Sequence, residues 1–139
     1  MQHKNLVYIV LTLIFIILSI GIFTYVLTNR DITVNPKSLS EKAGVVEVIV
    51  ALKLDDFGYE FNITLNTHST ELNYDLVSVS SLTNESGQAI KPSSWQGDGP
   101  GGHHREGKLI FPKFNNRPKI LNLTINEIGE KGVNFEWKL

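Results

Sequence analysis

Three histidines and one arginine are the side chains in this sequence whose types and spacing best suit chemistry. His103, His104 and Arg105 follow one another near the end of a glycine-rich segment, residues 92–107, and His68 lies well before it. Imidazole nitrogens are common ligands for copper and zinc, and a guanidinium binds carboxylates and other anions. Long irregular segments in compact domains are usually functional or disordered, so residues 92–107 are the candidate site.

A copper or zinc site is one interpretation of these residues, built from His68 with His103 or His104. Side chains of adjacent residues in an extended chain point to opposite faces, so one ion would not readily take both His103 and His104. Asp98 or Glu106 would then supply an oxygen ligand. This interpretation requires the two segments to meet in the folded chain.

Two other interpretations use the same segment without a metal. In a structural role, Trp95 covers the edge of the core, one histidine donates to a backbone carbonyl, and Arg105 pairs with Asp98 or Asp75. In a recognition role, an exposed loop on a rigid scaffold binds a protein, glycan or anion. The candidate binding residues would be Trp95, Asp98, His103, His104 and Arg105.

Several function classes are disfavoured by what the sequence lacks. The chain has no cysteine, which excludes a disulfide framework, a thiolate metal site and a cysteine nucleophile. The glycines are not followed by the Gly-Lys-Ser/Thr of a P-loop, and no serine lies in a G-x-S-x-G motif. A net charge of −1 disfavours nucleic-acid binding. We therefore expect neither catalytic activity nor a nucleic-acid partner.

Residues 6–28, LVYIVLTLIFIILSIGIFTYVLT, contain no charged side chain. A helix over this range would be roughly 34 Å long, enough to cross a hydrocarbon core of about 30 Å. The apolar stretch is longer than the core of a cleaved signal peptide, and no A-x-A-like site follows it. The sequence therefore predicts one uncleaved transmembrane signal anchor, with the lipid bilayer as its partner.

The charges beside this segment predict its orientation. Lys4 and the α-amine precede it, and the short tail contains nothing that must be translocated. We expect a single-pass protein of the cell membrane whose C-terminal part lies outside the cytoplasm. The expected divisions are a cytoplasmic tail at 1–5, the anchor at 6–28, a linker at 29–43 and an extracytoplasmic domain at 44–139.

The domain after the linker shows strand periodicity throughout. Apolar and polar residues alternate in short runs separated by turn residues, and no stretch after Ser40 has a convincing helical period. Strands are predicted at about 46–54, 61–66, 74–82, 88–91, 108–111, 121–126 and 133–139. This pattern predicts an all-β, immunoglobulin-like antiparallel β-sandwich, with a small barrel as the alternative.

Three N-x-S/T tripeptides begin at Asn62, Asn84 and Asn122 and would be candidate glycosylation sites in an exported domain. The first and third lie on predicted strands. There the asparagine and threonine fall on the face opposite the apolar residues, which supports the sandwich assignment.

The histidine motifs resemble those of a family of small prokaryotic β-domains that are exported and often membrane-anchored. The resemblance spans about residues 44–139. Its residues are Thr67-His68-Ser69, Leu72, Asp75-Leu76, Trp95 and the run Gly101-Gly102-His103-His104-Arg105-Glu106-Gly107-Lys108-Leu109-Ile110-Phe111, which has the pattern GGHHR-x-G-x-L-x-F. The resemblance implies an extracytoplasmic location and directs attention to the three histidines and Arg105, but it implies no particular chemistry.

The functional prediction that follows is a membrane-anchored, extracytoplasmic binding or accessory module without catalytic activity. Its partner would be a protein at the membrane surface. One alternative is a copper- or zinc-binding domain that uses His68 with His103 or His104. A further alternative is a small single-span subunit of a membrane complex.

Overall fold

The computed structural model describes residues 8, 12, 14–22, 38–129 and 131–139. The chain divides into two compact units, Met1–Thr33 and Val34–Leu139. Each unit is described by itself below.

In the first unit, residues 14–22 form a helix. Its large apolar side chains are exposed, with Phe15 at 74%, Ile17 at 68% and Ile22 at 64%. The Ser19 hydroxyl donates to the Ile16 carbonyl at 2.8 Å, so this polar group bonds to its own helix. Among the residues described, no helix combines the length and the apolar character needed to cross a membrane. Most of the predicted anchor, like the predicted tail at 1–5, lies outside the described residues.

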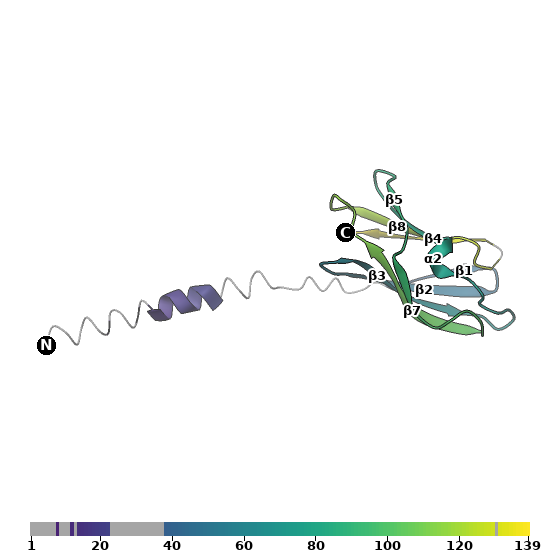
Figure 1. The fold of residues 1–139 in the computed structure, drawn as a ribbon, viewed down its shortest axis with the longest axis horizontal. Coiled ribbons are helices and arrows are strands. Elements are labelled where there is room, and N and C mark those ends of the chain that lie inside the picture. Colours follow the sequence, from purple (N-terminus) through teal and green to yellow (C-terminus); the bar gives the residue numbers. More distant parts are fainter. Residues whose placement is uncertain (1–7, 9–11, 13, 23–37, 130) are drawn as a thin grey trace. The chain divides into compact units, whose positions relative to one another are not determined.

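Within residues 38–129 and 131–139, the second unit contains nine strands in two antiparallel sheets (Figure 1). The first sheet has the order β1-β2-β3-β7-β6, and the second has the order β5-β4-β8-β9. The strands are β1 (Leu39–Ala43), β2 (Val46–Leu54), β3 (Gly58–Asn66), β4 (Ser80–Asn84), β5 (Ala89–Ile90), β6 (Ser94–Gly97), β7 (His104–Pro112), β8 (Ile120–Ile125) and β9 (Val133–Lys138). Two stacked antiparallel sheets confirm the predicted sandwich, and the barrel alternative is wrong.

The core forms because the strands alternate as the sequence indicates. In β2 the valines at 46, 48 and 50 are buried and the residues between them are partly exposed. Aromatic rings join the two sheets: Phe61 of β3 lies 5.2 Å from Trp137 of β9 and 5.5 Å, edge-on, from Phe111 of β7, between ring centroids. Such rings bury large apolar areas and favour tilted packing, so this cluster holds the layers together.

The predicted strand over residues 74–82 is wrong in its first half. Leu76–Val79 form a one-turn helix, α2, and the strand begins only at Ser80. The Asp75 side chain accepts a hydrogen bond from the Val77 backbone N–H at 3.1 Å, which caps the turn. Leu76 is buried by this turn. A local cap therefore overrides the β-propensity of the two valines.

Two predicted boundaries also differ from the structure. The linker predicted at 29–43 ends in β1, which pairs with β2 from Leu39 opposite Val50 to Ala43 opposite Val46. The sandwich therefore starts before residue 44, because Ala43 is needed in the core. The segment 92–107, predicted as a loop, is mostly the β6–β7 hairpin, and only residues 98–103 lie between the strands.

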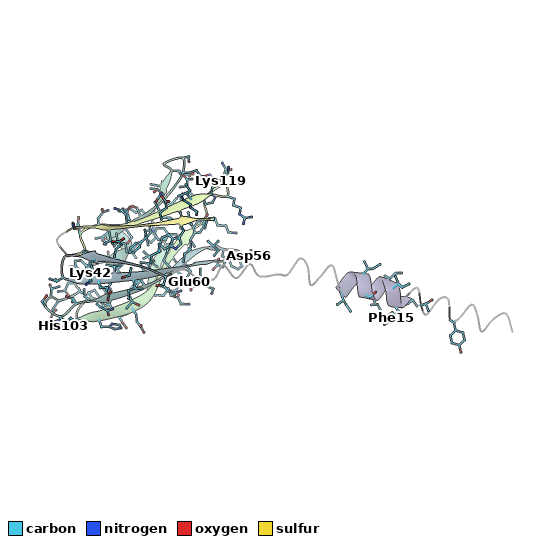
Figure 2. The ribbon with its side chains drawn as sticks, turned by 180° about the vertical axis from the view of Figure 1, so that it is seen from behind. Phe15, Lys42, Asp56, Glu60, His103 and Lys119 are labelled. Atoms are coloured by element: carbon cyan, nitrogen blue, oxygen red, sulfur yellow. The ribbon has the colours of Figure 1, made fainter. Side chains whose placement is uncertain are left out.

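The sandwich has two ends, which we name by what they carry. The histidine end contains the β1–β2 turn at 44–45, the segment 67–75 and the loop 98–103. The Phe57 end contains the β2–β3 turn at 55–57 and the connection 113–119. In Figure 2, His103 and Lys42 lie toward one end of the domain, and Asp56 and Lys119 lie toward the other.

Candidate functional site

The hairpin that carries the candidate residues depends on two facing glycines. Gly97 of β6 pairs with Gly107 of β7. A Cβ atom added to Gly107 would lie 2.6 Å from the Gly97 Cα and 2.7 Å from the Trp95 ring. Real Cβ atoms do not approach backbone so closely, so only glycine allows the two strands and the indole to pack here.

Arg105 is buried at the centre of the histidine end, with only 2% of its surface exposed. Its Nη1 donates to the carbonyls of Leu72 and Tyr74, each at 2.8 Å, and its Nη2 donates to the Asp98 carbonyl at 3.2 Å. The guanidinium therefore joins the segment before α2 to the β6–β7 hairpin. We call this set of bonds the Arg105 clamp.

Trp95 covers the Arg105 clamp from β6. Its ring centroid lies 5.7 Å from the Arg105 guanidinium carbon, within cation–π range. The indole N–H donates to the Asp98 carbonyl at 2.9 Å, the same oxygen that accepts from Arg105. Trp95 is only half-buried, so one part of the indole contacts the clamp and another part meets solvent.

The prediction that Arg105 pairs with a carboxylate is wrong in its geometry. Among the described residues, the hydrogen bonds of its guanidinium go to the backbone carbonyls of Leu72, Tyr74 and Asp98. Burial lowers the pKa of Arg105, and the charges of Asp98 and Asp75 oppose that shift from a distance. Arginine nevertheless remains charged in proteins, so the site holds a buried cation. Arg105 is not available to contact a ligand at the surface.

Backbone hydrogen bonds join the loop 98–103 to the segment that contains His68. The Thr67 N–H donates to the His103 carbonyl at 2.9 Å, and the Leu72 N–H donates to the Gly102 carbonyl at 3.0 Å. The two segments that the metal interpretation needs therefore lie side by side. Gly101 and Gly102 have φ values of 118° and 70°, which allow the loop to turn back on this segment.

The three histidines are exposed at this end. The His104 Nδ1 atom lies 2.6 Å from the Asn66 Oδ1 atom on β3, and its Nε2 atom lies 3.7 Å from the Glu106 carboxylate. His104 therefore belongs to the outer face of the first sheet. No cluster of three or more histidine, aspartate or glutamate side chains is placed to hold a metal within the described ranges.

The Asp98 carboxylate, predicted as a binding group or metal ligand, instead closes the hairpin. It accepts from the Glu106 backbone N–H at 2.9 Å, while the Asp98 N–H donates to the Glu106 carbonyl at 3.0 Å. One carboxylate oxygen is thereby committed to the loop. Asp98 contributes to the rigidity of the site in three ways: through its side chain, its N–H and its carbonyl.

A polar row on the outer face of the first sheet was missed by sequence reasoning. It runs from Glu47 on β2 through Asn66 on β3 to His104 and Glu106 on β7. The Asn66 amide nitrogen lies 3.5 Å from the Glu47 carboxylate, so its oxygen is free to face His104. Polar alternation along β3 signals an exposed face, but only the strand register brings these particular residues together.

The three N-x-S/T tripeptides lie in different environments. Asn62 is exposed on β3 and Asn122 is half-buried on β8. Asn84 is buried, and its Oδ1 atom accepts from the Ser86 N–H at 3.1 Å, the Ser86 hydroxyl at 2.7 Å and the Gln88 N–H at 3.0 Å. Asn84 therefore shapes the turn between β4 and β5, which accounts for an asparagine at this position without glycosylation.

Comparison with known proteins gives one structural likeness. No family model matches the chain, and no curated protein matches it. A solved structure that resembles it is the 1.5 Å crystal structure of MPT63, a secreted protein from Mycobacterium tuberculosis. The sequences are 17% identical, the match covers 75% of this chain and 92% of that chain, and the TM-score is 0.43.

Proposed function

We propose that this protein is a membrane-anchored, extracytoplasmic binding or accessory module without catalytic activity. Its sandwich would be immunoglobulin-like in class, and its binding surface would be the histidine end. The ligand best suited to that surface is a protein partner at the membrane, because tryptophan is enriched among the residues that dominate protein contact sites and Trp95 is partly exposed here.

One observation carries the proposal: the buried Arg105 clamp. A buried cation is costly, and hydrogen bonds to backbone carbonyls must compensate for its lost hydration. The clamp holds the segment 72–74 and the loop 98–103 together, so His68 and His103 are displayed on a surface that is already ordered. Such preorganisation lowers the entropic cost of binding.

The membrane part of the proposal has separate support. Residues 6–28 carry no charge, and the helix over 14–22 exposes large apolar side chains. Exposed apolar surface of this kind is unfavourable in water and favourable in a hydrocarbon core. Lys4 and the α-amine before the segment favour a cytoplasmic N-terminus, which would place the sandwich outside.

Site-specific photocrosslinking in intact membranes tests the binding surface. A photoreactive residue would replace His103, and the matched control would replace Glu136, which is exposed on β9. We expect a discrete adduct from position 103 alone. The purified partner should then bind the wild-type chain and E136A equally, and H103A at least about tenfold more weakly. Equal crosslinking from both positions, or equal binding by all three proteins, would contradict the proposal.

A copper or zinc site is the second candidate, favoured by the hydrogen bond between Thr67 and His103. That bond places the backbones of His68 and His103 on neighbouring segments. His104 is less suited, because its Nδ1 atom already faces Asn66. Titration of the full chain with Cu²⁺ and Zn²⁺ should show one site that is lost in both H68A and H103A and kept in H104A. Equal metal binding by the wild type, H68A, H103A and H104A would exclude this candidate.

The third candidate is a single-span subunit of a membrane complex. In that case the helix over 14–22 would contact other helices instead of lipid. Photoreactive residues at Phe15 and Ile17 would then give protein adducts, whereas a lipid-facing anchor would give lipid adducts only.

A further inference from the structure

The edge of the first sheet at β6 presents backbone groups that no other strand uses. The Asp98 N–H donates to the Glu106 carbonyl at 3.0 Å, so the even-numbered residues of β6 are those that bond to β7. The N–H and C=O groups of Trp95 and Gly97 therefore point away from β7, because these groups alternate along an antiparallel strand. In the described part of the chain no hydrogen bond reaches them, and Gly97 is exposed.

The other edges of the two described sheets are protected against pairing. In β1 the exposed Glu41 shares a face with the buried Ala43, so a charge points inward at that edge. β9 exposes Glu136 and Lys138, and β5 is only two residues long. Inward charges, lysines and short strands are the devices by which proteins prevent edge-to-edge contact. β6, residues Ser94–Gly97, has neither a charged residue nor a proline.

The backbone of β6 is complementary to a second copy of itself. When two β6 strands run antiparallel about a two-fold axis at Gln96, Trp95 of each copy lies opposite Gly97 of the other. These are the two residues whose N–H and C=O groups point outward, so every outward N–H meets a carbonyl of the other copy. The indole faces a residue that has no side chain, which avoids a collision.

The side chains on the other face of β6 match in the same register. Ser94, Gln96 and Asp98 share that face, because successive side chains of a strand alternate. The axis places Gln96 opposite its counterpart and Ser94 opposite Asp98. Two amides can bond to each other, and a serine hydroxyl can donate to a carboxylate. Among the described residues, the Glu106 N–H engages one Asp98 carboxylate oxygen, which leaves the other to accept from serine.

We propose that β6 is a homodimer interface, at which the first sheets of two copies join edge to edge into one continuous sheet. The backbone hydrogen bonds are those of strand addition to a sheet edge, and the two-fold axis makes each contact occur twice. β6 runs toward the loop 98–103, so antiparallel pairing directs the two histidine ends in opposite directions. The dimer therefore displays two copies of the proposed binding surface. This inference does not depend on membrane anchoring.

Disulfide trapping tests both the partner and the register. The chain has no cysteine, so a disulfide formed by a single-cysteine variant reports on the introduced residue alone. Q96C places cysteine at the axis, where the facing Cα atoms of a pair without hydrogen bonds are about 4.5 Å apart, within disulfide range. The matched control is S94C, on the same strand and face, which lies about 13 Å along the strand from its own counterpart.

The expected result is faster trapping at the axis. With oxidised glutathione, the full chain in detergent micelles should form a covalent dimer at least about tenfold faster as Q96C than as S94C. Equal rates for the two variants, or a faster rate for S94C, overturn the proposal. A disulfide that joins Q96C to a different protein in intact membranes, in place of a second copy, also overturns it.

The mass of the full chain tests the pairing without a covalent bond. Q96K sets like charges opposite each other at the axis, which destabilises a cross-strand pair. S40K is the control, because it adds the same charge to an exposed position on β1, the opposite edge of this sheet. Sedimentation in detergent micelles should show dimers for the wild type and S40K and monomers for Q96K. A monomeric wild type, a dimer that Q96K retains, or equal dissociation of S40K and Q96K would overturn the proposal.

Discussion

The Arg105 clamp allows a quantitative test through the substitution R105M. Methionine has a similar length and no charge, so it fills much of the same space without donating hydrogen bonds. The carbonyls of Leu72, Tyr74 and Asp98 would all lose the guanidinium. Two of them keep another donor, because Leu72 also accepts from Gly101 and Asp98 also accepts from the Trp95 indole.

The size of the effect follows from these contacts. The Tyr74 carbonyl loses the only hydrogen-bond donor found for it among the described residues, which costs about 1–3 kcal/mol. The carbonyls of Leu72 and Asp98 each lose one of two donors, which adds roughly 1 kcal/mol apiece to the loss of stability. Part of this total is offset, because R105M no longer buries a cation. We expect R105M to lower the free energy of unfolding by about 3 kcal/mol. For a domain of this size that is a fall of about 12 °C in the melting temperature.

Thermal melts followed by circular dichroism would measure this loss, with R117M as the control. Arg117 is exposed, so its replacement should change the free energy of unfolding by less than about 0.5 kcal/mol. Amide hydrogen exchange gives a local readout: the N–H groups of Thr67 and Leu72, which donate into the loop 98–103, should exchange faster in R105M. The reasoning is refuted if R105M and R117M melt together and both amides keep their protection.

Three further predictions concern the turns that shape the two ends. G107A should lower the free energy of unfolding by about 3 kcal/mol in a urea melt, because its Cβ atom would collide with backbone atoms. G99A is the control and should match the wild type, since no atom lies within 4 Å of a Cβ added there. Equal urea midpoints for the two variants would contradict the role of the paired glycines. N84A should lower the free energy of unfolding by about 2 kcal/mol, because the turn loses the buried oxygen that accepts its hydrogen bonds. A urea midpoint like that of the wild type would show that the turn does not depend on this oxygen. Hydrogen bonds from its own backbone N–H and from those of Lys119 and Ile120 lower the pKa of Glu85 in the folded chain. Its ionised form therefore contributes stability above a pH of 4.5, and this stability is lost as the pH falls through the lowered pKa. The urea midpoint of E85Q should therefore fall less steeply than that of the wild type as the solution is acidified. An equal fall in both proteins would exclude this role for Glu85.

Much of the sheet architecture could be predicted from local alternation. The runs around Val48, Phe61 and Leu123 have apolar side chains at every second position, and all three residues are buried. A strand places successive side chains on opposite faces, so this pattern depends only on neighbours in the sequence. Alternation gave the wrong prediction for the first half of 74–82, because the Asp75 side chain caps a helical turn there.

The candidate site could be located but not built from the sequence. The glycines and histidines of 92–107 drew attention to a segment that hydrogen bonds join to the one containing His68. The role of Arg105 could not be foreseen, because its partners lie 33, 31 and 7 residues away and are backbone carbonyls. Every residue carries such a carbonyl, so no residue type signals it.

Local sequence pattern was enough to identify the apolar side chains that enter the core, the charge-free segment and the loop that carries two of the histidines. These properties follow from composition and from the two-residue period of a strand. The burial of Arg105, the contact of His104 with Asn66 and the location of Phe57 and the histidines at opposite ends became apparent only in the folded chain. Each of these depends on strand register and chain direction, which bring together residues that are far apart in the sequence.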